Sequence, residues 1–127
     1  NQNTLKMEEK ITLLYVDDEP MNLKLFEINF RKKFNVLTAE SGNEGLEILK
    51  SNAEIIIVIS DMKMPGMNGI EFIRKAKIDF PKIRYFILTG FDITEEIADA
   101  LNERLIHKYF RKPFNIREIE ESIMEFL

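Results

Sequence analysis

Five short apolar runs alternate with helical patterns along the chain, and this alternation limits the fold more than any other feature. The runs cover residues 11–16, 36–39, 55–59, 83–88 and 106–110. Between them, apolar residues recur every three or four positions, which predicts one apolar stripe on each intervening helix. Strands that alternate with helices of this length favour βα units with right-handed crossovers. The sequence therefore predicts an α/β domain with a doubly wound parallel sheet and helices on both faces.

The composition of each run predicts its place in the sheet. Residues 55–59 read Ile-Ile-Ile-Val-Ile, and residues 11–16 are also nearly continuous in apolar side chains. Such runs are typical of strands buried on both faces of a parallel sheet. Residues 36–39 and 106–110 are shorter and more polar, which indicates edge strands.

Several residues suggest where helices begin. Asp92, with Glu95 three residues later, resembles a capping box. Asn115 is a favourable N-cap for the last helix. Phe34 follows Phe30 at helical spacing and continues the stripe of the first helix.

Length and composition exclude several classes of protein. A chain of 127 residues suits one domain, and a net charge of -4 with a pI of about 5.1 argues against nucleic-acid binding. The absence of cysteine excludes disulfides, thiolate metal sites and a cysteine nucleophile. No apolar run is long enough to span a membrane, and the polar residues 1–10 lack a signal-peptide core. We expect residues 1–10 to be a tail or linker, residues 11–127 to form the domain, and the cytoplasm to be its compartment.

Chemically active side chains stand at the ends of four of the five runs. They are Asp17, Asp18 and Glu19 after the first run, Asp61 after the third, Thr89 after the fourth and Lys112 after the fifth. In an open parallel sheet the carboxyl ends of the strands share one edge, where ligands bind at the switch point in strand order. Each residue alone could be ordinary loop chemistry. Their joint occurrence at four strand ends favours a single site.

Such a set of side chains suits phosphoryl transfer with a metal ion. Several carboxylates in one cleft repel one another and partly protonate unless a cation neutralises them. Mg²⁺ fits because it binds oxygen ligands and keeps waters or phosphate oxygens in its shell. A lysine ammonium suits a phosphate, and a carboxylate nucleophile can form an aspartyl phosphate.

Four motifs together carry a resemblance to a known family. They span Val16–Pro20, Ser60–Gly69, Leu88–Gly90 and Phe110–Phe114, in that order. Over about residues 11–127 the chain resembles the receiver domains of bacterial two-component response regulators, which have the CheY-like fold. The resemblance implies the strand order 2-1-3-4-5. It also implies a signalling phosphoacceptor, not an enzyme, which assists its own phosphorylation and dephosphorylation.

The resemblance implies a role for each acidic motif residue. Asp61 matches the phosphoacceptor. Asp17 and Asp18 match the acidic pair that holds Mg²⁺ together with Asp61. Lys63 matches the position whose backbone carbonyl, not its side chain, binds the metal.

It also implies which residues contact the phosphoryl group and transmit the signal. Thr89 and Lys112 match the hydroxyl and the ammonium that contact the phosphoryl group. The Lys112–Pro113 peptide bond is expected to be cis, an isomer nearly confined to bonds before proline. Tyr109 matches the aromatic switch residue that turns inward when Thr89 moves.

The expected partners follow from the same resemblance. The phosphoryl donor is a histidine kinase or a histidine phosphotransfer protein, so His107 is not the donor and is interpreted as a surface residue. An output domain or protein would bind the face of the fourth helix (about Thr94 to Leu105), the fifth strand and the fifth helix, where a phosphorylation-dependent dimer could also form. No direct contact with nucleic acid or membrane is expected. Lys63 and Phe91 are hypothesised to tune the lifetime of the phosphorylated state.

Two other functions are alternatives to a receiver domain. The first is an interaction module of the same fold that is never phosphorylated. Such a module would not need the complete set of Asp17, Asp18, Asp61, Thr89 and Lys112. The second is a flavodoxin-like or phosphatase-like enzyme. A flavin phosphate site would require a loop rich in Gly, Ser and Thr after the first strand. A haloacid-dehalogenase-type phosphatase would require an Asp-x-Asp motif at that position. Asp17-Asp18-Glu19 fits neither pattern.

Overall fold

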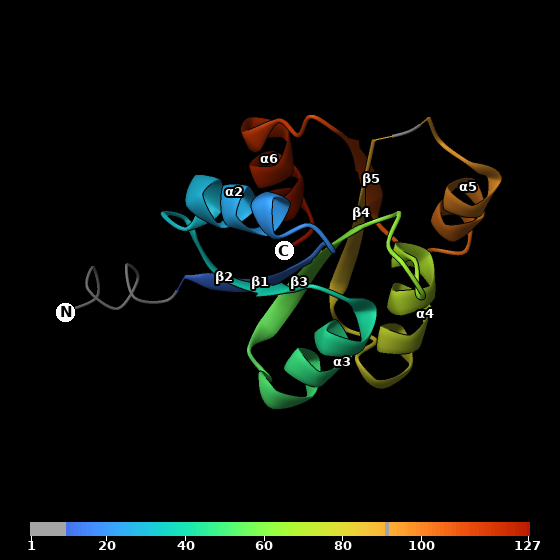
Figure 1. The fold of residues 1–127 in the computed structure, drawn as a ribbon, viewed down its shortest axis with the longest axis horizontal. Helices are drawn as coiled ribbons and strands as arrows, with labels where there is room; N and C mark the ends of the chain where they lie inside the picture. The colour runs from blue at the N-terminus through green and yellow to red at the C-terminus, as the bar shows by residue number, and fades with distance from the viewer. Residues whose placement is uncertain (1–9, 91) are drawn as a thin grey trace.

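Five parallel strands form a single sheet in the order β2-β1-β3-β4-β5, which confirms the predicted fold and the two predicted edges (Figure 1). The computed structural model describes residues 10–90 and 92–127. In chain order the elements are β1 (Ile11–Val16), α2 (Pro20–Phe30), β2 (Phe34–Ala39), α3 (Gly42–Ser51), β3 (Ile55–Asp61), α4 (Gly69–Asp79), β4 (Arg84–Thr89), α5 (Glu95–Asn102), β5 (Lys108–Arg111) and α6 (Ile116–Glu125). The predicted tail, apart from Lys10, and Phe91 lie outside the described residues. Among the described helices, none combines the length and the hydropathy of a membrane span.

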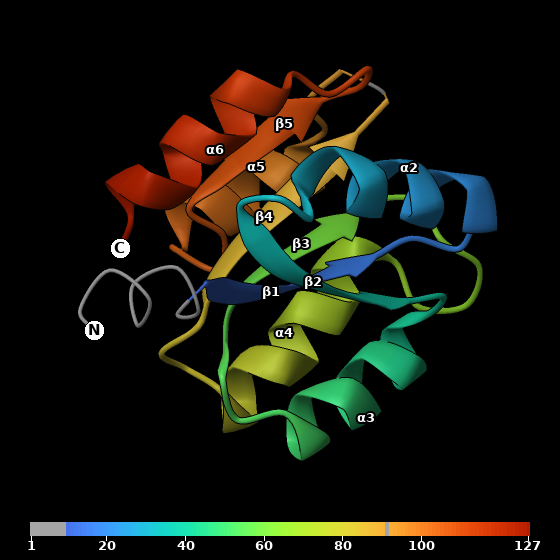
Figure 2. The same ribbon diagram turned by 90° about the vertical axis from the view of Figure 1, so that its left-hand side faces the viewer.

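The sheet separates two apolar clusters. α2 and α6 cover one face, and α3, α4 and α5 cover the other (Figures 1 and 2). Successive side chains of a strand point to opposite faces. In β3, Ile57 and Ile59 accordingly pack with α2 and α6, whereas Val58 packs with the other cluster. Burial on both faces explains the apolar side chains of residues 57–59, whereas Ile56, near the start of the strand, is exposed.

Two local predictions about the helices were wrong. Phe34 does not extend the stripe of α2, because that helix ends at Phe30 and Phe34 begins β2 as a buried residue. Asp92 does not cap α5. The N-cap is Thr94, which accepts a hydrogen bond from the Ile97 N–H, while Asp92 forms an ion pair with Arg111.

Other helix starts follow their capping residues. The Asn115 side chain accepts a hydrogen bond from the Glu118 N–H at 3.0 Å, which confirms it as the N-cap of α6. Asn68 and Glu71 form a reciprocal capping box at the start of α4. This box fixes where the loop after β3 ends and the helix begins.

His107 is half-buried and is not the surface residue that was predicted. Its ring lies 6.0 Å from the Phe86 ring and 5.0 Å from the Phe126 ring, and its Nδ1 is buried without a hydrogen-bond partner. Burial lowers the pKa of His107, and the nearby cations Arg84 and Lys77 lower it further. The aromatic contacts, which come from distant parts of the chain, make this site apolar.

The loop after β3 folds back against the end of that strand. The Gly69 N–H donates to the Met62 carbonyl at 2.8 Å. A Cβ at Gly69 would overlap the Asp61 carbonyl oxygen and approach the Ile87 Cδ1 to 2.8 Å. Glycine permits this close approach of two backbone segments, and the approach holds the loop beside Asp61.

Substitution of Gly69 by Ala should destabilise the fold. Overpacking against a backbone carbonyl should lower the free energy of unfolding by about 1–3 kcal/mol, measured by urea denaturation. Gly90→Ala is the matched control, because its Cβ would meet only the Lys112 Cδ at 3.8 Å. Equal stability of the two variants would contradict the tight packing inferred for Gly69.

His107 should make the stability of the domain depend on pH. Because its pKa is lower in the folded protein than the ordinary value of 6.5, the unfolded chain binds more protons as the pH falls. The stability contribution is therefore complete above that value and is lost below it. His107→Phe keeps a ring between Phe86 and Phe126 but cannot titrate. Between about pH 7.5 and 5.5, the free energy of unfolding should fall more in the wild type than in this variant, and parallel curves would refute the effect.

Candidate functional site

Three carboxylates converge at the carboxyl edge of the sheet. Asp17 and Asp18 follow β1, and Asp61 is the last residue of β3, the neighbouring strand. One carboxylate oxygen from each of the three residues lies within 4.8 Å of the others. Asp17 is fully buried and Asp61 is 7% exposed, so little water is available to separate their charges. The strand pairing thus creates the cluster that the sequence predicted.

Lys112 brings a positive charge to this cluster from the end of β5. Its Nζ lies 3.0 Å from Asp61 Oδ1 and 3.7 Å from Asp17 Oδ2. Its backbone N–H donates to the Thr89 carbonyl at 2.8 Å, which fixes the loop after β5 to the end of β4. The following Lys112–Pro113 peptide bond is cis. The Lys112 ammonium therefore lies beside two of the three carboxylates, those of Asp17 and Asp61.

The environment of Asp61 disfavours its charged form. Burial raises the pKa of Asp61, the hydrogen bond and charge of Lys112 lower it in part, and the Asp17 charge raises it again. The net effect is a raised pKa of Asp61. A cation at this point would reverse the balance, since it would stabilise every carboxylate of the cluster.

Asp17 is held by two hydrogen bonds within the chain. The Glu19 N–H donates to Asp17 Oδ1 at 3.0 Å, and the Tyr15 hydroxyl donates to Asp17 Oδ2 at 2.7 Å. Tyr15 lies outside the motifs from which the site was predicted. The available signal was its spacing, because residues two apart in a strand point to the same face. Burial and the Asp17 charge raise the pKa of Tyr15, so its hydroxyl stays protonated.

Thr89 and Tyr109 lie on the side of the site towards α5. Thr89 ends β4, is 1% exposed and lines a pocket of about 270 Å³. Its neighbours in the pocket are Met62, Lys63, Met64, Asn68 and Thr94. Tyr109 is half-buried, lies opposite Ile87 in the β4–β5 register and packs against the α3-α4-α5 cluster. The Lys63 side chain is exposed, in the loop that follows Asp61.

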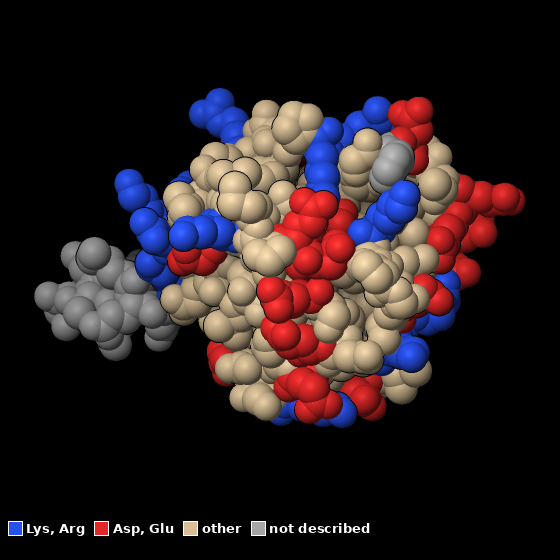
Figure 3. Space-filling view, in the orientation of Figure 1, with Lys and Arg blue, Asp and Glu red and all other residues tan. Residues whose placement is uncertain are grey.

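The surface charge has the same polarity as the site. On the face shown in Figure 3, Asp and Glu side chains form a band down the middle of the molecule, with Lys and Arg side chains bordering its upper end. Such a field attracts cations and disfavours a phosphate that arrives without one.

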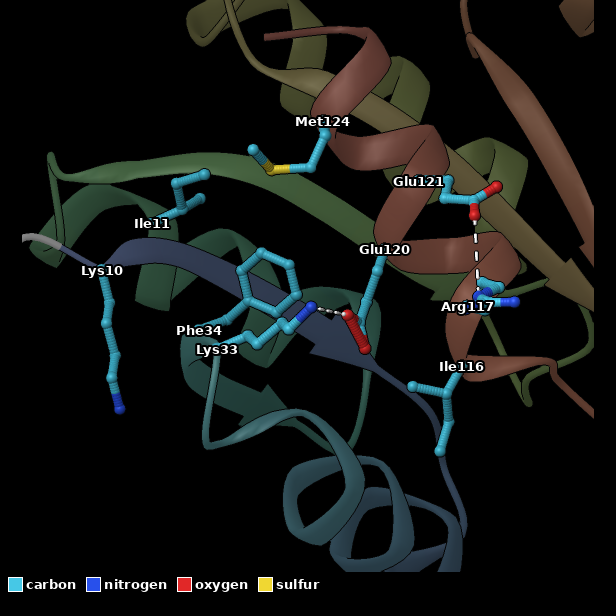
Figure 4. Close-up of a pocket in the computed structure, with 9 residues that line it drawn as sticks. All are labelled: Lys10, Ile11, Lys33, Phe34, Ile116, Arg117, Glu120, Glu121 and Met124. Carbon is cyan, nitrogen blue, oxygen red and sulfur yellow. Dashed lines mark ion pairs between the residues drawn. The ribbon is translucent and has the colours of Figure 1, made fainter. Parts of the chain in front are cut away.

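A larger pocket, of about 850 Å³, lies elsewhere (Figure 4). It is formed by Ile11 and Phe34 at the starts of β1 and β2 and by one side of α6. Lys33 reaches across it to Glu120, with an Nζ–Oε2 distance of 2.6 Å. The strand starts are at the opposite end of the sheet from Asp61, so this pocket does not belong to the carboxylate site.

Comparisons with known proteins agree with this arrangement. Residues 13–124 match the family model of the response regulator receiver domain. Sporulation initiation phosphotransferase F of Bacillus subtilis is 31% identical over 122 residues, which is 95% of each chain. The hydrogenase transcriptional regulatory protein HoxA of Cupriavidus necator is 29% identical over 84% of this chain, but the match spans only 22% of HoxA.

Solved structures show the same architecture. The response regulator TrrA of Thermotoga maritima, crystallised in complex with Mg²⁺-BeF, superposes with a TM-score of 0.78 and is 27% identical, over 91% of this chain and 98% of that one. The match of a family model to nearly the whole chain, together with this shared fold, shows that the chain belongs to the receiver domains of response regulators.

Proposed function

We propose that Asp61 is the residue that accepts a phosphoryl group, from the phosphohistidine of a histidine kinase or of a histidine phosphotransfer protein. One observation carries the assignment: an oxygen of Asp61 lies within 4.8 Å of oxygens of Asp17 and Asp18, and Asp61 Oδ1 lies 3.0 Å from the Lys112 ammonium. Transfer of a phosphoryl group to a carboxylate depends mainly on neutralising charge and on positioning the reacting groups.

The cluster suits Mg²⁺. The charge of Lys112, which lies beside Asp17 and Asp61, offsets only part of the negative charge of the three carboxylates, and their oxygens are the hard ligands that Mg²⁺ prefers. Asp17, Asp18 and Asp61, with the backbone carbonyl of Lys63, would hold the ion. When bound, it would neutralise the carboxylates and the oxygens of the incoming phosphoryl group.

Asp61, Lys112 and Thr89 would each have a separate role in the phosphoryl transfer. A carboxylate oxygen of Asp61 forms a bond to phosphorus while the bond from phosphorus to the donor imidazole nitrogen breaks, and the nitrogen keeps the electron pair. Lys112, already beside Asp61, would move its ammonium onto a phosphoryl oxygen. The Thr89 hydroxyl would donate to another. Because Asp61 is itself modified, the domain acts as a phosphoacceptor that assists its own phosphorylation and dephosphorylation.

Signal transmission would follow from the contact between β4 and β5. Thr89 lies opposite Arg111 in the strand register, and its carbonyl accepts the Lys112 N–H. Movement of Thr89 and Lys112 towards a phosphoryl group would displace both loops and change the packing of Tyr109. We infer that α5, β5 and α6 form the face that binds an output domain, a separate protein or a second copy. The phosphorylated and unphosphorylated states must then differ in affinity for the partner.

The donor would approach across α2. Met21, Leu25 and Ile28 are 79%, 53% and 46% exposed and follow one another at helical spacing. Leu25 also lines a pocket of about 370 Å³ together with Lys112. An apolar stripe this close to the acceptor suits a partner with an apolar surface of its own.

Three further proposals extend beyond the described geometry. Lys63, with its exposed side chain, and Phe91, which lies outside the described residues, would tune the lifetime of the phosphorylated state. The cytoplasm is the proposed compartment. HoxA is much longer than this chain, so attachment of the domain to an output region is also a proposal.

Phosphorylation should require Asp61. Incubation of the wild type with Mg²⁺ and acetyl phosphate should add the mass of one phosphoryl group, and Asp61→Asn should add none. Asp92→Asn is the matched control, since Asp92 is exposed and pairs only with Arg111 among the described ion pairs. Intact-protein mass spectrometry measures all three. A wild type that stays unmodified would favour the alternative of an interaction module that is never phosphorylated.

Mg²⁺ should stabilise the wild type and should do so less in Asp61→Asn. At about ten times its dissociation constant, the ion should raise the free energy of unfolding by about 1.4 kcal/mol. Because the environment raises the pKa of Asp61, the neutral variant should be the more stable protein without metal. Urea unfolding with and without MgCl₂ measures both effects, with Asp92→Asn as the control. A variant that is less stable than the wild type without metal would show that the Lys112 ion pair outweighs the cost of burial and of the Asp17 charge.

A further inference from the structure

The Tyr15 hydroxyl is the one buried side-chain donor, among the described contacts, that binds the cluster without being a family motif residue. It donates to Asp17 Oδ2 at 2.7 Å, and Tyr15 itself is 1% exposed. A buried hydroxyl with one short bond to a buried carboxylate is a strong positional constraint. The resemblance and the comparisons assign no role to this residue.

Packing fixes the ring that carries this hydroxyl. The Tyr15 ring stacks on the Phe26 ring of α2, with centroids 4.1 Å apart and planes 10° apart. Phe26 in turn contacts Phe30 at 4.4 Å and Phe114 at 5.8 Å between centroids. Tyr15 therefore cannot follow Asp17 if the carboxylate turns, and the hydroxyl acts as a fixed point for it.

The hydroxyl also affects Lys112. Asp17 Oδ2 accepts the Tyr15 bond at 2.7 Å, whereas the Lys112 Nζ lies 3.7 Å from the same oxygen, beyond hydrogen-bond length. The ammonium instead lies 3.0 Å from Asp61 Oδ1. Without the hydroxyl, Oδ2 would be a buried acceptor lacking its donor, and Lys112, whose ammonium lies 3.7 Å away, could replace it.

We propose that Tyr15 is a positioning residue of this site: its hydroxyl orients the Asp17 carboxylate for cation binding and keeps the Lys112 ammonium directed at Asp61. This inference rests on the proposed function. It predicts that loss of the hydroxyl weakens Mg²⁺ binding, because Asp17 loses its orientation and Lys112 competes with the cation for the same oxygen. Partners that orient a metal ligand typically change metal affinity by about 10–100-fold.

The test is a Mg²⁺ titration of the wild type and of two Tyr→Phe variants, followed by ¹H–¹⁵N NMR. Tyr15→Phe keeps the stacked ring and removes only the hydroxyl. Tyr85→Phe is the matched control, because Tyr85 is fully buried and its hydroxyl donates to the Phe80 carbonyl at 2.8 Å, on a different part of the fold. Both variants lose one buried hydroxyl, and the titrations are run well below the unfolding midpoint of each protein.

We expect the Mg²⁺ dissociation constant to rise about tenfold in Tyr15→Phe and to stay unchanged in Tyr85→Phe. An unchanged constant in Tyr15→Phe, or an equal rise in both variants, would overturn the role of Tyr15 and leave the proposed function standing. Failure of the wild type itself to bind Mg²⁺ would overturn both.

Discussion

The gathering of the negative charges of Asp17, Asp18 and Asp61 in a largely buried place is the constraint on which the rest of the site depends. Their oxygens lie within 4.8 Å of one another, at a place where two of the three residues are buried, and Lys112 offers only one positive charge in return. Neighbouring parallel strands force this proximity, because β1 and β3 end side by side. The fold therefore holds a site that binding of a cation or transfer of a charged group can relieve. Geometry that is unfavourable in the free protein becomes useful when the ligand arrives.

The parts that hold this cluster also connect it to the surface. The loop after β3 is closed by Gly69 against the Asp61 backbone, and the loop after β5 is joined to β4 through the Lys112 N–H and the Thr89 carbonyl. A change at the acceptor therefore acts on rigid strand ends, and α5 and β5 lie directly beyond them. In contrast, the large pocket between α6 and the strand starts is at the other end of the sheet and does not share these contacts.

The sequence predicted those features that follow from local pattern, and missed those that depend on distant partners. The shorter, more polar runs predicted the edge strands, and the common carboxyl edge of parallel strands predicted the convergence of Asp17, Asp61 and Lys112. His107 was misjudged because its environment is made by Phe86 and Phe126, which no short-range pattern reveals. Thr94, and not the predicted Asp92, is the N-cap of α5, whereas Asp92 forms an ion pair with Arg111 at the end of β5. The sequence pattern marks Tyr15 only as a strand residue, and its role in the site follows from its hydrogen bond to Asp17.

The position of a bound cation tests the central claim most directly. Crystals soaked in Mn²⁺, a stand-in for Mg²⁺ with measurable anomalous scattering, would locate the ion without any assumption about activity. We expect an anomalous peak between the carboxylates of Asp17, Asp18 and Asp61, within coordination distance of at least two of them. A peak only at other surface carboxylates, or none at a concentration that saturates related sites, would contradict it.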